Sequence, residues 1–121
     1  MKILIVDDSR TMRMIVRRTL RQAGYDHHTV YEASNGSEAL SAIRDASPDV
    51  VLCDWNMPEM SGIDVLTTLR QNGVWTKFGF VTSESTAEMH DRALQAGADF
   101  FISKPFTAET LQSALDPILA A

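Results

Sequence analysis

The chain alternates between short, nearly continuous apolar runs and longer segments in which apolar residues recur at helical spacing. Five apolar runs occupy residues 2–6, 28–33, 49–54, 77–82 and 99–103. Runs of this length are typical of strands, and the third and fifth are almost wholly apolar, as expected of strands covered on both faces. The pattern therefore predicts five strands, each followed by an amphipathic helix.

Capping and stop residues mark the helix boundaries. The first helix is predicted from about Arg10, and the last one starts after Thr107. A polar cap with an acidic residue three positions later predicts the other starts, at Asn35 with Glu38, Ser61 with Asp64, and Ser85 with Glu88. Stop signals follow the first four helices, at Gly24, Pro48, Asn72-Gly73 and Gly97.

The regular alternation predicts a single α/β domain over residues 1–121. Right-handed crossovers make the strands parallel and place helices on both faces of the sheet. If the second strand lies at the edge beyond the first, the strand order is 2-1-3-4-5. In open sheets of this kind, ligands bind at the carboxyl ends of the strands, so chemistry is expected there.

Composition narrows the functional classes. The net charge of −5 disfavours direct binding of nucleic acid, and the single cysteine, Cys53, excludes an internal disulfide. The sequence shows neither a secretory signal pattern nor an apolar run of membrane-spanning length. We therefore expect a reducing, cytoplasmic setting without membrane contact.

The charge is unevenly distributed, because the first 25 residues carry +4 and the remainder −9. Five arginines surround apolar positions of the first predicted helix: Arg10, Arg13, Arg17, Arg18 and Arg21. We interpret this arrangement as a solvated helix face, with a docking surface for a partner as the alternative.

Polar residues follow four of the five predicted strands. They are Asp7 and Asp8, Asp54, Thr82 and Lys104. Taken singly, an acidic pair could cap a helix, and an aspartate at a strand end could form a turn. With the order 2-1-3-4-5, however, these strands are neighbours and their ends share one edge, which predicts a cluster.

Three carboxylates within about 4 Å of one another repel by about 4 kcal/mol per pair at an effective dielectric near 20, so the cluster needs a cation. An all-oxygen site with room for water suits Mg²⁺, which is completed by phosphate oxygens. Asp54 stands alone at the centre and is the candidate nucleophile toward phosphorus. Lys104 and the Thr82 hydroxyl are candidates to bind phosphoryl oxygens.

Four ordered motifs carry a resemblance that spans the whole chain: VDDS at 6–9, DWNMP at 54–58, VTSE at 81–84 and KPFT at 104–107. They resemble the receiver domain of bacterial response regulators, and within that family the stand-alone chemotaxis regulators. The resemblance implies a flavodoxin-like fold and a two-component signalling role. It implies a phosphoacceptor that assists its own phosphorylation and dephosphorylation, and not an enzyme.

The resemblance also implies a role for each motif residue. Asp54 would accept a phosphoryl group from a phosphohistidine on a histidine kinase. Asp8 and Asp54 would bind Mg²⁺ directly, Asn56 through its backbone carbonyl, and Asp7 mainly through water. Lys104 would hold a phosphoryl oxygen.

A conformational switch is implied as well. Thr82 would move toward the phosphoryl group while Phe101 turns inward, which remodels the face formed by the fourth helix, fifth strand and fifth helix. This face would bind a protein target, and a phosphatase is a further possible partner. Asn56 and Glu84 would lie beside the path of attacking water and tune dephosphorylation.

Two departures from the family pattern fall on the expected output face. Phe101 stands where chemotaxis members commonly have tyrosine, so no hydroxyl is present for a partner. Pro117 lies inside the last helical pattern, and we expect it to kink the helix or end it early, since an interior proline costs about 3 kcal/mol. Both departures leave the phosphorylation site intact but weaken the expectation of a flagellar-motor partner.

Two alternative functions remain at this point. The chain could be a receiver module from a longer regulator with a DNA-binding or enzymatic output domain. It could also be a phosphohydrolase that uses an aspartyl phosphate. Such enzymes commonly need an acid/base aspartate two residues after the nucleophile, and Asn56 occupies that position.

Overall fold

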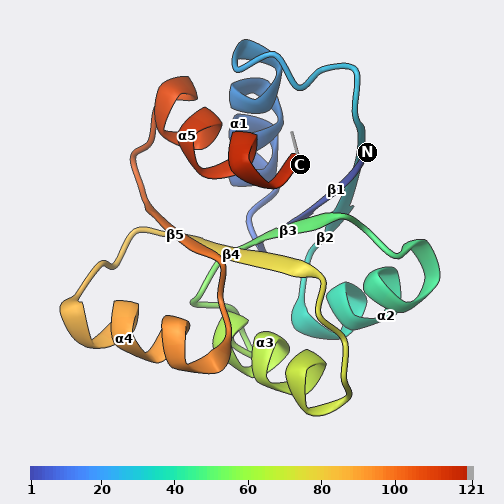
Figure 1. Ribbon diagram of the computed structural model, residues 1–121, viewed down its shortest axis with the longest axis vertical. Coiled ribbons are helices and arrows are strands. Elements are labelled where there is room, and N and C mark those ends of the chain that lie inside the picture. Colours follow the sequence, from blue (N-terminus) through green and yellow to red (C-terminus); the bar gives the residue numbers. More distant parts are fainter. Residues whose placement is uncertain (120–121) are drawn as a thin grey trace.

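Within residues 1–119, five strands alternate with five helices, as the sequence pattern predicts (Figure 1). The structure, a computed structural model, describes residues 1–119. The strands are β1 (Lys2–Val6), β2 (Thr29–Ala33), β3 (Val50–Cys53), β4 (Lys77–Thr82) and β5 (Phe100–Ser103). The helices are α1 (Arg10–Gln22), α2 (Gly36–Ala46), α3 (Gly62–Gln71), α4 (Ala87–Ala96) and α5 (Ala108–Leu119).

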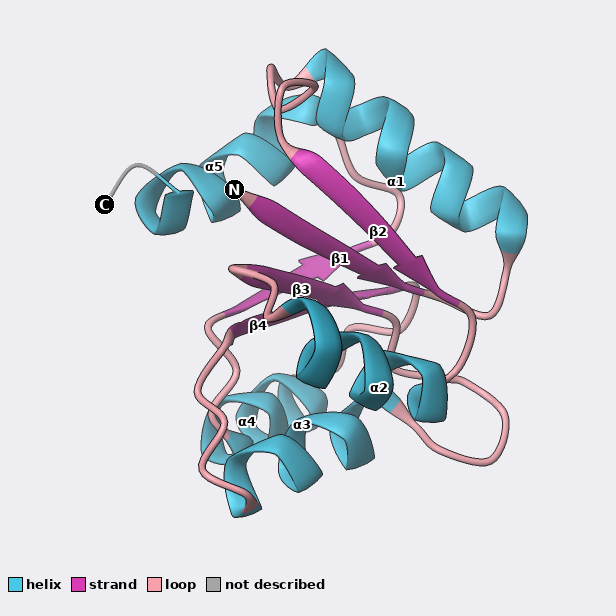
Figure 2. Cartoon of the chain, turned by 90° about the vertical axis from the view of Figure 1, so that its right-hand side faces the viewer, coloured by secondary structure: helices cyan, strands magenta, loops and turns pink. Residues whose placement is uncertain are grey.

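The strands form one parallel sheet in the order β2-β1-β3-β4-β5, which confirms the predicted order. Helices α1 and α5 cover one face, and α2, α3 and α4 cover the other (Figure 2). Every strand therefore points the same way, and the carboxyl ends meet along one edge. β2 and β5 are the edge strands, and β3 lies in the centre.

Burial of both faces explains why the central strand is purely apolar. All four residues of β3 are at most 1% exposed. Val50 and Leu52 pack with α1 and α5, whereas Val51 and Cys53 pack with α2, α3 and α4. Because successive side chains point to opposite faces, a strand between two helical layers has no polar side.

Two of the predicted strands start one residue too early, because each prediction includes an aspartate that precedes the strand in the structure. The side chain of each aspartate binds the backbone of a neighbouring strand. The Asp49 carboxylate accepts from the backbone N–H of Lys2 at 2.7 Å, and the Asp99 carboxylate accepts from that of Phe78 at 2.9 Å. Each aspartate thus satisfies a backbone donor near the start of the neighbouring strand, Lys2 being the first residue of β1 and Phe78 the second of β4.

Most predicted helix caps are confirmed. The side chains of Asn35, Ser61 and Thr107 each accept from the backbone N–H three residues later. Ser61 and Asp64 form the complete capping box. The Glu38 carboxylate binds the backbone N–H of Ser34 and not that of Asn35, so the second predicted box is incomplete.

The predicted start of α4 is wrong by one residue. The cap is Thr86, whose hydroxyl accepts from the N–H of Met89 at 3.1 Å. The hydroxyl of Ser85, the predicted cap, lies 3.1 Å from the His90 ring nitrogen. A side chain that is engaged with a ring on the helix is not available to the helix backbone.

Pro117 does not end α5 early, because the helix continues through it to Leu119. The proline occupies the last described turn, where a missing N–H removes a bond only near the helix end. The preceding residue, Asp116, accepts from the Tyr25 hydroxyl and connects this turn to the segment that follows α1. Within residues 1–119, no helix has both the length and the apolar character needed to cross a bilayer.

Arg70 connects three segments at the sheet edge opposite the carboxyl ends. Its guanidinium donates to the carbonyls of Val74 and Thr76 before β4, and to that of Gly97 directly after α4. It also lies 3.6 Å from the Asp99 carboxylate. The carboxyl-terminal end of α4 is therefore tied to α3.

Gly62 sets the distance between α3 and the loop after β3. A Cβ at this position would lie 2.2 Å from the Asp54 carbonyl oxygen and 2.9 Å from the Phe80 ring. The glycine N–H donates to the Trp55 carbonyl at 2.8 Å. No side chain fits here without moving the backbone that carries Asp54.

We expect Gly62→Ala to lower the free energy of unfolding by about 1 to 3 kcal/mol, because overpacking against backbone is not relieved by a rotamer change. Gly73→Ala is the comparison, since Gly73 has a positive φ of 74° but open space around it. Urea unfolding measures both variants. An effect of Gly62→Ala smaller than that of Gly73→Ala would contradict the steric argument.

Candidate functional site

The carboxyl edge of the sheet brings together the predicted polar residues. Asp7 follows β1, Asp54 follows β3, and Lys104 follows β5. The Lys104 ammonium lies 3.1 Å from one oxygen of Asp7 and 3.7 Å from one oxygen of Asp54. Three separate strand ends therefore converge on one charged centre, which is what the parallel topology predicts.

Asp8 completes an acidic triad. One carboxylate oxygen from each of Asp7, Asp8 and Asp54 lies within 4.8 Å of the others. Asp7 is buried, Asp54 is partly buried and Asp8 is exposed. The triad thus opens to solvent on the Asp8 side and can hold a metal ion.

Asp7 is fixed by the start of α1. One of its carboxylate oxygens accepts from the Ser9 N–H at 2.9 Å, and Ser9 itself caps the helix. Arg13, one turn further on, donates to the Asp7 carbonyl at 2.6 Å and pairs with Glu32 on β2. The interpretation of all five arginines as a solvated face is therefore wrong for Arg13, which is bound to the site's backbone.

Asp54 carries a charge in a place that disfavours it. Its side chain is only 12% exposed, and one oxygen accepts from the Trp55 N–H at 2.9 Å. Burial raises the pKa of Asp54 to about 6, with a further rise from Asp7, while Lys104 acts in the opposite direction. At neutral pH the group is mainly ionised, but its surroundings compensate its negative charge only in part.

Thr82 ends β4 and is fully buried. Its hydroxyl oxygen accepts from the Glu84 N–H at 3.4 Å, a long contact, and its carbonyl accepts from the Lys104 N–H at 2.8 Å. Glu84 in turn accepts from the Asn56 side-chain amide at 3.2 Å. The two residues predicted to tune dephosphorylation are thus in contact with each other across the mouth of the site.

Phe101 lies next to a group of aromatic rings. Its ring centroid is 6.3 Å from that of Trp55 and 3.9 Å from that of His90 on α4. The Arg92 guanidinium, also on α4, lies 5.5 Å from the Trp55 ring. Sequence reasoning missed His90 and Arg92, because neither belongs to a motif and their partners are far away in the chain.

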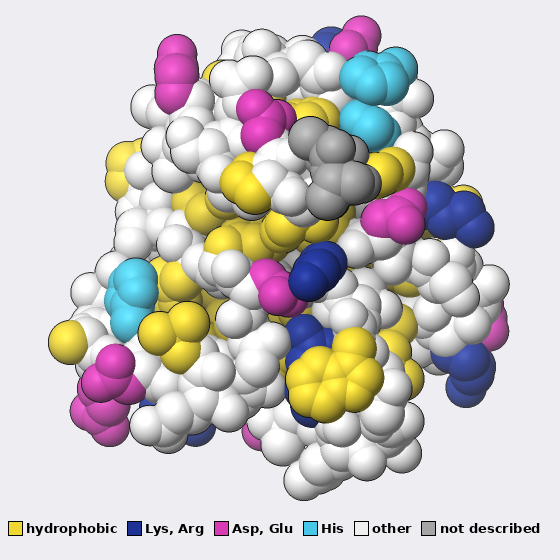
Figure 3. Space-filling model, viewed as in Figure 1, with side chains coloured by type: hydrophobic (Ala, Val, Ile, Leu, Met, Phe, Trp, Pro, Cys, Tyr) yellow, Lys and Arg dark blue, Asp and Glu magenta, His cyan; other side chains and the backbone are white. Residues whose placement is uncertain are grey.

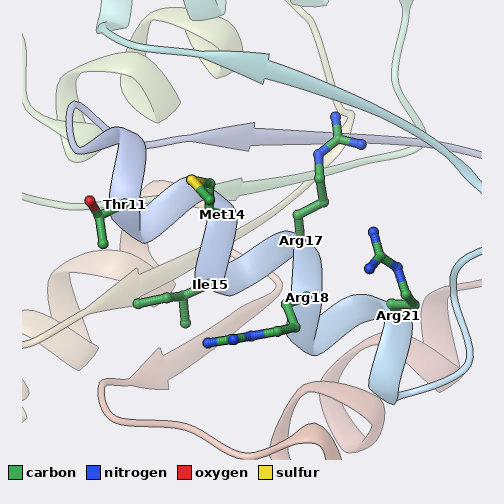
Figure 4. A pocket seen from close by; sticks show the side chains of 6 residues that line it. All are labelled: Thr11, Met14, Ile15, Arg17, Arg18 and Arg21. Carbon is green, nitrogen blue, oxygen red and sulfur yellow. The ribbon is translucent and has the colours of Figure 1, made fainter.

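A groove of about 500 Å³ runs along the exposed side of α1 (Figure 4). Its lining is Thr11, Met14, Ile15, Arg17, Arg18 and Arg21. A second cleft of about 410 Å³, lined in part by Ile15, Lys104 and Phe106, lies beside the carboxylate site.

An acidic triad and a lysine at the carboxyl edge of a 2-1-3-4-5 sheet define a phosphoacceptor site of the receiver class. The family profile described as "Response regulator receiver domain" matches residues 3–116. The chain belongs to the response regulator receiver domain family. It is therefore a signalling phosphoacceptor and not a classical enzyme, and a histidine kinase is the implied phosphoryl source.

Relatives of known role are similar over nearly the whole chain. "Chemotaxis protein CheY-3" of Vibrio cholerae is 43% identical over 120 residues, covering 98% of this chain and 91% of the relative. "Chemotaxis protein CheY1" of Helicobacter pylori is 40% identical over 123 residues, covering 98% and 97%.

Solved structures agree with the fold. The chemotaxis protein CheY4 of Vibrio cholerae, crystallised at low pH, has a TM-score of 0.85 with 34% identity and 97% coverage of both chains. A response regulator receiver domain protein from Clostridium thermocellum has a TM-score of 0.85 with 28% identity, covering 98% of this chain and 94% of its own.

The raised pKa of Asp54 predicts how metal-free protein stability depends on pH. A carboxyl whose folded pKa of about 6 exceeds its ordinary value of 3.8 destabilises the fold above pH 6. We expect Asp54→Asn to raise the free energy of unfolding by about 1 to 3 kcal/mol at pH 7.5 in a chelating buffer. This gain should shrink as the pH falls from 6 toward 4, because the wild-type carboxyl is then protonated in the folded state while the unfolded state only begins to take up a proton.

Urea unfolding of both proteins at pH 7.5 and pH 4 tests this expectation. A lower stability of Asp54→Asn at pH 7.5 would show that attraction to Lys104 outweighs burial, which is the reverse of the predicted balance.

Proposed function

We propose that this protein, as a receiver domain over residues 1–121, accepts a phosphoryl group on Asp54 from a histidine kinase. Phosphorylation then changes its surface to control a protein partner in chemotaxis. The observation that carries the proposal is the position of Asp54: a partly buried carboxylate 3.7 Å from Lys104 and beside two further carboxylates. The names of the relatives support the chemotactic role.

The donor set of the triad fits Mg²⁺. All available ligands are oxygens, and the open side at Asp8 leaves room for water. Both oxygens of Asp7 already have partners, Ser9 N–H and Lys104, so Asp7 is suited to a water-mediated contact. Asp8, Asp54 and the Asn56 backbone carbonyl would then hold the ion directly. When bound, Mg²⁺ neutralises the carboxylates and binds phosphoryl oxygens.

The transfer is a displacement at phosphorus. A carboxylate oxygen of Asp54 forms the new P–O bond while the P–N bond to the donor histidine breaks, and its electron pair stays on the imidazole. Lys104 can leave Asp7 and place its ammonium on a phosphoryl oxygen. Thr82 has its hydroxyl hydrogen free to donate, because its contact with Glu84 uses the oxygen as acceptor.

Hydrolysis of the acyl phosphate requires water in line with the bond to be broken. Asn56 and Glu84 are both exposed and are joined by a 3.2 Å contact at the entrance to the site. We assign them to controlling this access, so they set the lifetime of the phosphorylated form. A phosphatase would act at the same opening.

The output face is formed by α4, β5 and α5. β5 is one of the two edge strands, and α4 and α5 both contact it. Apolar side chains gather in the hollow between α4 and α5 (Figure 3). Movement of Thr82 and Phe101 would remodel this face, which binds the target. We place these events in the cytoplasm, where two-component kinases present their phosphohistidine.

Phosphorylation of Asp54 is testable by intact mass spectrometry after incubation with Mg²⁺ and a small acyl-phosphate donor. We expect a single labile phosphoryl adduct on the wild type and none on Asp54→Asn, because the amide is not a nucleophile toward phosphorus. An adduct of equal yield on Asp54→Asn would place the acceptor elsewhere. Asp54-dependent hydrolysis of the donor without an adduct would favour the phosphohydrolase.

Binding of Mg²⁺ is testable by titration followed through Trp55 fluorescence or calorimetry. Asp8→Asn should weaken the affinity by at least about tenfold, because it replaces a charged direct ligand by a neutral one. Asp45→Asn, an exposed acid on α2, is the matched control and should leave the affinity unchanged. Equal affinity of Asp8→Asn and wild type would remove Asp8 from the ligand set.

A further inference from the structure

The imidazole of His90 lies between Phe101 and the loop that follows β4. His90 is in the first half of α4, and its ring stacks on Phe101 with a centroid distance of 3.9 Å and an interplanar angle of 31°. Its Nε2 is 3.1 Å from the Ser85 hydroxyl. One side chain thus contacts both the proposed switch residue and the segment that begins at Thr82.

Phe101 is held by packing from two sides. On its inner side lie Phe80 and Trp55, at centroid distances of 6.2 and 6.3 Å. Phe80 is fully buried, and Trp55 directly follows Asp54. His90 stacks on the ring as well. A phenyl ring has no polar group to anchor it, so only packing holds Phe101 in this position, and the stack on His90 is its shortest ring contact.

The residues from Thr82 to Ser85 connect the stack to the phosphoacceptor. In the contact between the Thr82 hydroxyl and the Glu84 N–H, at 3.4 Å, the hydroxyl oxygen is the acceptor, and the contact is long and weak. The hydroxyl hydrogen is therefore available to a phosphoryl oxygen on Asp54. If Thr82 turned toward that oxygen, the weak contact with Glu84 would break and the loop that carries Ser85 would be free to move away from His90.

We propose that His90 is a positioning residue that holds Phe101 in its resting packing and releases it when this loop rearranges. The inference rests on the proposed function, because it requires a phosphoryl group on Asp54. The two parts of the imidazole have separate roles. The ring face stacks on Phe101, and Nε2 contacts the Ser85 hydroxyl, so that a movement of the loop changes the position of the ring. An aromatic contact of this kind shifts an equilibrium by about two- to tenfold.

The first test uses wild-type protein. Nuclear Overhauser effects between the ring protons of His90 and Phe101 should be present in the resting protein and lost with Mg²⁺ and an acyl-phosphate donor. Intact mass is measured in parallel. If the adduct forms and the cross-peaks persist, His90 does not release Phe101 and the inference is wrong. If no adduct forms, the proposed function fails, and this inference fails with it.

Two variants separate the two roles. His90→Gln keeps a side-chain donor for Ser85 but has no ring, so the Phe101 ring signals should move toward their phosphorylated positions without a donor, by a two- to tenfold change in population. His90→Phe keeps the ring but loses the contact with Ser85, so its resting spectrum should match wild type while the phosphorylation-induced shift is reduced.

Gln95→Ala, an exposed site on the same helix, is the control and should behave as wild type in both states. Circular dichroism confirms that each variant is folded. If Phe101 signals in resting His90→Gln remain at the wild-type positions, the role of His90 is purely structural and the proposal is overturned. The wild-type cross-peaks test the proposal even if a variant does not fold.

Discussion

The repulsion among three carboxylates at one edge of a parallel sheet is the constraint on which the rest of this molecule depends. The buried core of β1 and β3 delivers Asp7 and Asp54 to the same place, and the close packing of Gly62 against the Asp54 carbonyl leaves little freedom to separate them. Lys104 is the cation that the structure places within 4 Å of two of these groups. Its single charge is insufficient, so the site is poised to take up further positive charge.

Much of the fold follows from local sequence rules. The apolar runs locate the strands because a parallel sheet covered on both faces requires them. The polar residues at the strand ends locate the site because all carboxyl ends share one edge. From sequence alone, the edge position of β2 is an assumption supported by the lack of reactive residues at its carboxyl end, and the observed strand order confirms it.

The errors arise where a choice depends on contacts between distant segments. Ser85 and Thr86 are both competent caps, and the choice falls on Thr86 because Ser85 is occupied by His90. Arg13 has the same sequence signature as the exposed Arg10 and Arg18, yet it faces the Asp7 carbonyl because of its phase on the helix. Pro117 is tolerated because it lies near a helix end, which depends on how far α5 continues.

The hydrogen bond from Arg70 just beyond the carboxyl-terminal end of α4 makes that end the natural pivot of the helix. Arg70 holds the Gly97 carbonyl just after its carboxyl-terminal end, whereas its amino-terminal end is joined to the loop from Thr82. Ten residues make a rod of about 15 Å. A tilt of about 10° around the Arg70 fulcrum displaces the free end by about 2.5 Å and the fixed end hardly at all. Geometry alone thus amplifies a small local rearrangement and confines it to one side of the molecule.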